Sequence, residues 1–246
     1  MKLLAFDTSA EGMSIAVSRD DGAAAGLWQQ QGEGGAKASA GLIAGVLDLM
    51  QQANLQLSEL DAICFGCGPG YFTGLRTACA VAQGLAFGAN VPVLPVNSLL
   101  ALAEDARFQH FANAAHLQVS AMLDARMDEI YQATFAWSAG AWTELQGAEL
   151  KSPEEVRVVP QADGLTVAAG NAFAVYGPRL TGLDAAVQQV QVLPQATAML
   201  RLAPQLLAAG KAVPAEQALP VYVRDKVAQT TAERAAIKAA QAVATA

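Results

Sequence analysis

The sequence predicts an α/β fold of two related lobes, each built on a mixed β-sheet flanked by helices. The first observation is the order of elements in residues 1–107, where three meandering strands precede two helical crossovers to further strands. The second is a recurrence. A strand, an aspartate, a short polar turn and a second strand occur around Asp7 and again around Asp124. Such a recurrence indicates a duplicated architecture.

The composition is that of a globular protein with its own hydrophobic core. The chain has 246 residues, of which 53% are hydrophobic and 15% charged, with a formal net charge of −7. A domain of this size buries about 70% of its unfolded surface, so it needs no metal or disulfide to fold. The acidic balance also disfavours direct nucleic-acid binding, which depends on Lys and Arg at phosphates.

The first half alternates strands and helices. A turn at residues 7–12 joins the first two strands, and Thr73 is the expected N-cap of the second helix. Helical spacing of Leu42, Val46 and Leu49 predicts the first helix. In order, we predict strands at 2–6, 13–18 and 26–31, a helix at 37–53, a strand at 62–66, a helix at 73–89, a strand at 91–96 and a helix at 98–107.

The second half is less regular. Ser152 opens a capping box that ends at Glu155, with Pro153 at the first helical position. The other predicted elements are strands at 117–123, 129–136 and 165–169, a helix at 196–209 and an extended segment at 220–223. We assign residues 1–107 and about 196–227 to the first lobe, residues 108–195 to the second, and residues 228–246 to an Ala-rich tail, either a peripheral helix or a frayed end.

The cysteines do not form a recognisable metal or disulfide framework. Cys64 and Cys67 form a C-x-x-C motif, but Cys79 leaves an odd number and no histidine lies nearby. A redox pair and two small buried residues at a strand end are both open, and we favour the second. Residues 77–103 lack charge, yet their amides and prolines indicate helix, strand and helix rather than a membrane span. We expect no metal, no membrane segment and a cytoplasmic location.

A glycine-rich loop between the strand at 62–66 and the following helix is a candidate phosphate site. A helix N-terminus that follows such a loop offers free N–H groups to an anion. No Gly-Lys-Ser/Thr follows, however, and a third glycine of the dinucleotide fingerprint is missing. We favour a tight strand-to-helix connection as the explanation of the loop, and a hairpin turn explains Asp7, Thr8 and Ser9 as well as a phosphate site does. The candidate phosphate residues are Asp7, Thr8, Ser9, Gly68, Gly70 and Thr73.

Two helices lack the polar outer face that a crossover helix normally keeps. Residues 40–47 contain no polar side chain, and the polar residues of 74–89 are Arg76, Thr77 and Gln83 alone. Burial in the core of the chain would explain this, but we favour a helix-mediated protein interface, because a large exposed apolar patch otherwise promotes aggregation. The interface candidates are Leu42, Val46, Met50, Leu75, Arg76, Cys79, Ala82 and Leu85.

Four segments together resemble the TsaB (YeaZ) family. Residues 68–76 read GPGYFTGLR, close to the family signature GPGSFTGLR, with Tyr71 where the family usually has Ser. Residues 4–9 resemble the opening strand of the family, residues 123–131 its DAR-x-x-E-x-Y segment, and residues 220–224 its closing P-x-Y-x-R. The motifs occur in the family order and extend to about residue 227.

The resemblance implies a two-lobed fold of the actin/Hsp70/sugar-kinase type, which is ribonuclease-H-like. The family acts in making N6-threonylcarbamoyladenosine at position 37 of tRNAs that read codons beginning with adenine. Its catalytic relative TsaD holds a metal with a His-x-x-x-His pair, whereas the corresponding helix here, from Lys37 onward, has no histidine. The resemblance therefore implies a subunit with no catalytic residue and no metal.

The resemblance also implies partners. The chain is expected to form a heterodimer with a TsaD-like transferase through its first two helices and to activate it. A TsaE-like ATPase is a possible third subunit, and the isolated chain is expected to form a homodimer. Contact with tRNA would be indirect, since Arg76 is the only Lys or Arg in residues 38–106. No cofactor is expected, although a nucleotide at the crevice or the partner interface stays open.

Two other functions remain as alternatives. One is an ATP-dependent, kinase-like enzyme that uses Asp7 or Asp124 as its base and the glycine loop for phosphate. The other is a glycoprotease-like metallopeptidase, which the lack of a histidine pair disfavours.

Overall fold

The computed structural model describes residues 1–21, 25–34, 38–161 and 164–224. These residues form two five-stranded sheets, in the orders β3-β2-β1-β4-β5 and β10-β9-β6-β7-β8. In each sheet the three strands that come first in the chain pair antiparallel with one another: β1–β3 in one and β6–β8 in the other. The two later strands of each sheet pair in parallel, β4 with β1 and β5 in the first sheet and β9 with β6 and β10 in the second. The second sheet therefore repeats the ribonuclease-H-like order of the first, which confirms the predicted two-lobed, duplicated α/β fold.

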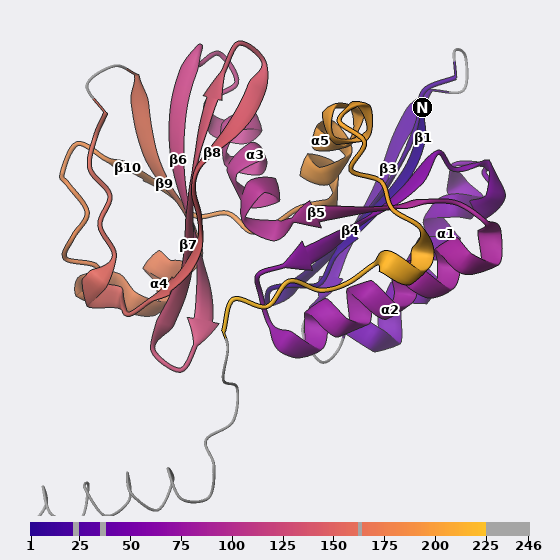
Figure 1. Cartoon of the computed structure of the whole chain (residues 1–246), viewed down its shortest axis with the longest axis horizontal. Helices are drawn as coiled ribbons and strands as arrows, with labels where there is room; N and C mark the ends of the chain where they lie inside the picture. The colour runs from indigo at the N-terminus through magenta and orange to yellow at the C-terminus, as the bar shows by residue number, and fades with distance from the viewer. Residues whose placement is uncertain (22–24, 35–37, 162–163, 225–246) are drawn as a thin grey trace, which may run out of the picture.

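The first sheet is covered by helices on both faces (Figure 1). Its strands are β1 Lys2–Asp7, β2 Gly12–Arg19, β3 Gly26–Glu33, β4 Ala62–Gly68 and β5 Val93–Asn97. Leu4 and Phe6 face α1 (Ala38–Gln52) and α2 (Phe72–Ala89). Leu3 faces α5 (Ala196–Ala208) on the other side. Because both faces are buried, β1 reads as a continuous hydrophobic run.

The second sheet packs one face on α3 (Ser98–His110), whose N-cap Asn97 accepts the backbone N–H groups of Leu99 and Leu100. The opposite face carries α4 (Ala172–Tyr176). The strands are β6 His116–Arg126, β7 Glu129–Ser138, β8 Ala141–Lys151, β9 Leu165–Gly170 and β10 Gln188–Val190, and the short 3-10 turns are η3 Leu57–Glu59, η4 Pro153–Glu155, η5 Gly177–Arg179 and η6 Ala215–Gln217.

Helices α3 and α5 lie between the two sheets and pack on each other (Figure 1). Their contact is polar as well as apolar. The buried carboxylate of Glu104 on α3 accepts hydrogen bonds from Arg107, from Arg201 on α5 and from the indole of Trp142 on β8. One buried acidic group thus connects α3 and α5 to the second sheet.

The predicted elements of the first half are confirmed to within a few residues, but β8, β10 and α4 are additions. Thr73 is not the N-cap of α2. The helix begins at Phe72, and the chain changes from extended to helical conformation at Tyr71, which makes no side-chain cap. The capping box of Ser152 is confirmed, although it caps only a single 3-10 turn. The start of the first predicted helix at Lys37 and the Ala-rich tail lie outside the described residues.

Candidate functional site

The turn after β1 holds the carboxylate of Asp7 inside the protein. The two oxygens of Asp7 accept hydrogen bonds from the backbone and hydroxyl of Ser9, at 2.7 and 2.6 Å, and from the hydroxyl of Ser98 at 2.9 Å. Burial raises the pKa of Asp7, and these hydrogen bonds partly oppose the increase. A Cβ atom on Gly66 would lie 1.9 Å from the carboxylate, so glycine is required beneath it.

The glycine loop packs directly on this turn. The backbone N–H of Tyr71 donates to the carbonyl of Ser9 at 2.7 Å, and the hydroxyl of Thr8 donates to the carbonyl of Gly74 at 2.7 Å. A Cβ atom would lie 2.4 Å from the Ser9 carbonyl if added to Gly70, and 1.8 Å from the Thr8 carbonyl if added to Gly74. Close backbone contact between loop and turn explains these glycines.

The candidate phosphate residues are only partly accessible. Asp7, Thr8 and Ser9 are at most 1% exposed. Gly70 and Thr73 line a cavity of about 510 Å³ between the lobes, and the other candidates do not. Phosphate binding by this set stays a prediction. The residues that line the cavity are Glu11, Glu33, Gly34, Gly70, Tyr71, Phe72, Thr73, Leu75, Ala125, Arg126, Tyr131, Val221, Tyr222 and Arg224.

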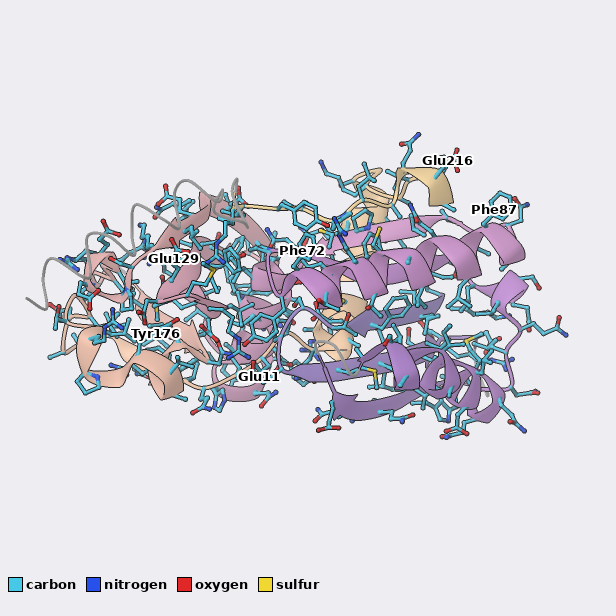
Figure 2. The ribbon with its side chains drawn as sticks, turned by 90° about the horizontal axis from the view of Figure 1, so that it is seen from below. Glu11, Phe72, Phe87, Glu129, Tyr176 and Glu216 are labelled. Atoms are coloured by element: carbon cyan, nitrogen blue, oxygen red, sulfur yellow. The ribbon has the colours of Figure 1, made fainter. Side chains whose placement is uncertain are left out.

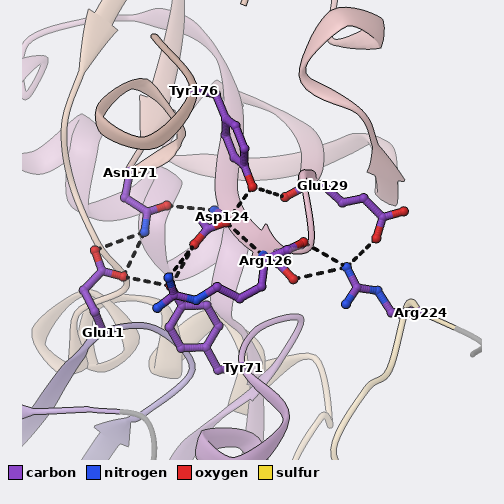
Figure 3. Close-up of polar contacts among 9 residues, drawn as sticks. Glu11, Tyr71, Asp124, Arg126, Glu129, Asn171, Tyr176 and Arg224 are labelled. Atoms are coloured by element: carbon purple, nitrogen blue, oxygen red, sulfur yellow. Dashed lines mark hydrogen bonds and ion pairs between the residues drawn. The ribbon is translucent and has the colours of Figure 1, made fainter. Parts of the chain in front are cut away.

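Tyr71 crosses from the glycine loop of the first lobe to the second lobe (Figure 3). Its hydroxyl lies 3.1 Å from a carboxylate oxygen of Asp124 and 3.4 Å from Glu11. The guanidinium of Arg126 lies over its ring, 4.4 Å from the centroid. Desolvation, followed by the charges of Asp124 and Glu11, raises the pKa of Tyr71. The side chain therefore stays a neutral donor that joins the lobes.

The carboxylate of Asp124 accepts hydrogen bonds from two tyrosine hydroxyls and a backbone N–H group (Figure 3). Besides Tyr71, the hydroxyl of Tyr176 donates to it at 2.8 Å, and the backbone N–H of Arg126 donates at 2.8 Å. The backbone N–H of Asp124 itself donates to Asn171, whose amide group donates to Glu11 at 2.8 and 3.0 Å. Asp124 is thus the centre of a network that spans both lobes.

The turn between β6 and β7 is held in an unfavourable conformation. Arg126, Met127 and Asp128 have φ angles of 61, 57 and 60°, so three successive side-chain-bearing residues are left-handed. This conformation costs about 1–2 kcal/mol per residue. Arg224 holds the turn by donating to the carbonyls of Ala125 at 3.1 Å and Arg126 at 3.2 Å.

Residues 219–224, which we call the strap, run from the first lobe to the second (Figure 1), and Val221, Tyr222 and Arg224 of the strap line the cavity. The backbone N–H of Val221 donates to the carbonyl of Cys67 in β4 at 2.7 Å. The ring of Tyr222 lies 5.4 Å from that of Phe72 at the start of α2. The strap ends at Arg224, which binds the β6–β7 turn of the second lobe and Glu129.

The predicted interface residues mostly point the wrong way for an interface. Six of them face the first sheet and are at most 6% exposed, because α1 and α2 use this side to build the core: Leu42, Val46, Met50, Leu75, Cys79 and Ala82. Leu85 is partly buried against the same core, and Arg76 is exposed. These six positions are therefore part of the core rather than of an outer surface, and an interface through α1 and α2 stays a prediction.

The outward side of the same helices is nevertheless apolar. Ile43 and Leu47 on α1 are 49% and 52% exposed, and Phe87 on α2 is 82% exposed. Figure 2 shows Phe87 at the far end of α2 and Phe72 at the end nearest the second lobe. We call this surface the docking face, after the role that is proposed for it below: Ser39, Ala40, Ile43, Ala44, Leu47, Phe72, Thr73, Arg76, Thr77, Ala80, Gly84, Phe87 and Gly88.

A signal for the outward side of these helices was present in the sequence. The eight consecutive apolar residues 40–47 do not indicate which side of α1 faces outward. The charged residues do, because Asp48 and Arg76 are the only ones in α1 and α2. Both are exposed and mark the outward side. Ala44, Leu47 and Ala80 lie within one helical turn of them and are exposed as well.

The three cysteines are reduced and buried, as we favoured. Burial raises the pKa of Cys64 to about 12, so its thiol is unreactive. Within the described ranges, His, Cys, Asp and Glu form no group of three or more that could hold a metal ion. None of the helices described here combines the length and apolarity that a membrane crossing requires.

Comparisons with known proteins agree with this architecture. The family model for TsaD, tRNA N6-adenosine threonylcarbamoyltransferase, matches residues 37–246. The tRNA threonylcarbamoyladenosine biosynthesis protein TsaB of Escherichia coli K12 is 34% identical over 93% of this chain and 96% of its own, and that of Haemophilus influenzae is 32% identical over 92% and 95%. The structure of YeaZ from Pseudomonas aeruginosa is 36% identical, with a TM-score of 0.78 over 90% of this chain and 99% of that one. Relatives of this similarity and coverage, together with the duplicated fold, show that the chain belongs to the TsaB (YeaZ) family.

Proposed function

We propose that this chain is the TsaB subunit of the system that makes N6-threonylcarbamoyladenosine at position 37 of tRNAs that read codons beginning with adenine. In this role it docks on a TsaD-type transferase and activates it, and performs no chemistry itself. The names of the relatives and the TsaD family model support the assignment to this pathway. The observation that carries the docking role is the docking face of α1 and α2.

Exposed glycines distinguish this face from ordinary surface. Gly84 and Gly88 lie within α2 on either side of Phe87, and a Cβ atom added to either would meet nothing within 4 Å. Glycine inside a helix is less stable than alanine by about 0.8–1 kcal/mol, and no contact within the described chain requires it here. Small residues let a second helix approach closely. The pattern fits a helix of a partner lying over α2.

The polar groups of the crevice support a non-catalytic role. Asp7 accepts hydrogen bonds from Ser9 and Ser98, and Asp124 accepts them from Tyr71 and Tyr176, so neither carboxylate faces the cavity as a free base. The chain has only two histidines, and α1 contains none. These observations favour a docking subunit over the kinase-like and metallopeptidase alternatives.

The same face supports the remaining partners in our proposal. A heterodimer with the transferase covers it in the working complex, and a homodimer covers it when the chain is alone. Contact with tRNA belongs to the transferase, since this chain carries a net charge of −7. A TsaE-like ATPase is part of the proposal through family membership alone.

The test compares two leucines of equal exposure. Leu47→Glu places a carboxylate on the docking face, whereas Leu145→Glu places one on β8 of the second lobe, where the leucine is 51% exposed. A carboxylate buried without a partner costs about 3–5 kcal/mol. Isothermal titration with the purified transferase should therefore show binding at least about 100-fold weaker for Leu47→Glu and unchanged for Leu145→Glu. Formation of the modified nucleoside in a reconstituted reaction should fall in parallel.

Equal binding by both variants would contradict the proposal. Val46→Glu and Ala82→Glu are unsuitable as tests, because both positions are fully buried and the substitutions would disrupt the core. Thermal unfolding of Leu47→Glu, compared with wild type, shows whether the exposed substitution leaves the fold intact.

A further inference from the structure

Arg76 is held in one orientation on the docking face by two aromatic side chains. Its guanidinium carbon lies 4.0 Å from the ring centroid of Phe72, and its Nε donates to the hydroxyl of Tyr222 at 3.1 Å. Tyr222 is held in place in turn, because the backbone N–H of its neighbour Val221 donates a hydrogen bond to the carbonyl of Cys67. The two hydrogen-bonded residues Arg76 and Tyr222 are 146 positions apart in the sequence. The arrangement therefore depends on the fold, which brings the strap against α2.

The terminal nitrogens of this guanidinium have no hydrogen-bond partner among the residues that the structure describes. Within the described part of the chain, Arg76 forms no ion pair, and its only hydrogen bond uses Nε. The contrast with Arg224 and Arg201 is clear, because each of these pairs with a carboxylate. Arg76 is thus oriented by the chain, while its terminal nitrogens stay open to solvent.

In the part of the chain that the structure describes, the groove around Arg76 contains no other charged residue, and its lining combines apolar residues with Ser39, Thr73 and Thr77. Arg76 is the only Lys or Arg of residues 38–106 and lines this surface groove with Ile43, Phe72 and Ala80. Phe72 also lines the cavity between the lobes, so Arg76 stands where the docking face meets the cavity mouth. A partner covering the groove would remove water from the guanidinium, and an uncompensated buried charge is strongly unfavourable.

We propose that Arg76 is a carboxylate-binding site, and that an Asp or Glu side chain of the transferase pairs with its terminal nitrogens. The inference rests on the proposed docking function and adds the chemistry of the contact. A guanidinium presents two parallel donors that match the two oxygens of a carboxylate. Because Phe72 and Tyr222 orient it beforehand, little side-chain freedom is lost on binding. The pair fixes the register of an otherwise apolar helix contact.

A protein carboxylate fits this site better than a phosphate of RNA. Binding to a nucleic-acid backbone depends on several cations that together neutralise successive phosphates. Here, within the described ranges, a single guanidinium lines the groove. The adjoining cavity is lined by Glu11 and Glu33 and by two arginines, Arg126 and Arg224, whose guanidinium groups already pair with the carboxylates of Asp124 and Glu129. The net charge of −7 also opposes a polyanion.

The experiment titrates the full-length transferase with wild-type chain and variants at 50, 150 and 300 mM NaCl, where salt screens the ion pair progressively. Arg76→Gln should weaken binding at least about tenfold at low salt and remove most of the salt dependence. Arg76→Lys should restore the charge but only part of the affinity, because it lacks the paired donors. Lys151→Gln, which removes one cation from β8 in the second lobe, should match wild type.

Tyr222→Phe tests the orientation of the guanidinium. It keeps the ring against Phe72 but removes the hydroxyl that accepts from Arg76, so it should weaken binding in the wild-type background. In the Arg76→Gln background it should have no further effect on affinity. An equal loss in both backgrounds would show that the hydroxyl acts independently of Arg76 and would overturn the proposed orientation.

The outcomes separate this inference from the docking function. If Leu47→Glu abolishes binding while Arg76→Gln retains wild-type affinity and salt dependence, the docking face stands and the carboxylate site is wrong. If both variants bind like wild type, both proposals fail. If Arg76→Gln leaves transferase binding intact and weakens binding of a tRNA transcript, the ligand is a phosphate and the inference is overturned.

Discussion

An aspartate lies at or near the end of the first strand of each sheet, Asp7 as the last residue of β1 and Asp124 two residues before the end of β6, and their surroundings differ. Asp7 is enclosed by serine hydroxyls and by Gly66, while Asp124 is enclosed by two tyrosines and an arginine. In an enzyme that uses such turns, a carboxylate would have to face substrate. Here hydrogen bonds within the chain occupy both, so the aspartates act as structural centres of their turns.

This difference predicts a pH dependence for Asp7. Burial raises the folded-state pKa of Asp7 above the unfolded value of about 4, so the native chain keeps a proton that the unfolded chain has lost. The free energy of unfolding attributable to Asp7 therefore falls as pH rises from about 4 through the folded-state pKa. Urea unfolding between pH 4 and 8 should show Asp7→Asn gaining stability relative to wild type as pH rises. Asp20→Asn, at an exposed site, is the control, and a pH-independent difference for Asp7→Asn would contradict the prediction.

At the scale of the element, α2 contains glycines that serve opposite purposes. Gly74 allows contact with the carbonyl of Thr8 inside the chain, whereas Gly84 meets nothing. Gly74→Ala should lower the free energy of unfolding by at least about 1–3 kcal/mol through overpacking. Gly84→Ala should raise it by about 0.8–1 kcal/mol through helix propensity. Urea unfolding measures both.

Binding gives Gly84→Ala a second readout. If a helix of the transferase lies close over Gly84, the added methyl group should weaken transferase binding even though it stabilises the isolated chain. A variant that is more stable and binds as well as wild type would place the partner elsewhere on the docking face.

The helices and strands were predictable where their side chains were buried on both sides. Leu4, Phe6 and Ile63 belong to hydrophobic runs that only a covered sheet explains. The pattern fails for β8, an edge strand in which most side chains are half or fully exposed, and for β10, which has three residues. From the sequence we predicted correctly that the glycine loop lies beside the Asp7 turn. The outward side of α1 and the path of Tyr71 across the crevice were not predicted, because they depend on tertiary packing.

At the scale of the whole molecule, polar contacts at several separate places join the lobes in the described part of the chain. Glu104 connects α3, α5 and β8, Glu11 and Tyr71 reach Asn171 and Asp124 across the crevice, and the strap runs from the first lobe to the second. Lobes fastened on both sides of the crevice favour a rigid body with a fixed docking face over a clamp that closes on a substrate. A rigid face is suited to recognition, because its side chains and backbone lose little conformational freedom when a partner binds.

A rigid apolar face also predicts the behaviour of the isolated chain. Ile43, Leu47 and Phe87 are exposed together, and a self-complementary face of this kind is most simply covered by a second copy about a two-fold axis. Sedimentation velocity at tens of micromolar should show a dimer for wild type and Leu145→Glu and a monomer for Leu47→Glu. Because the homodimer and the transferase compete for one face, adding the transferase should convert the homodimer into a heterodimer. A strictly monomeric wild type, or a homodimer that persists inside the transferase complex, would show that the face is not shared.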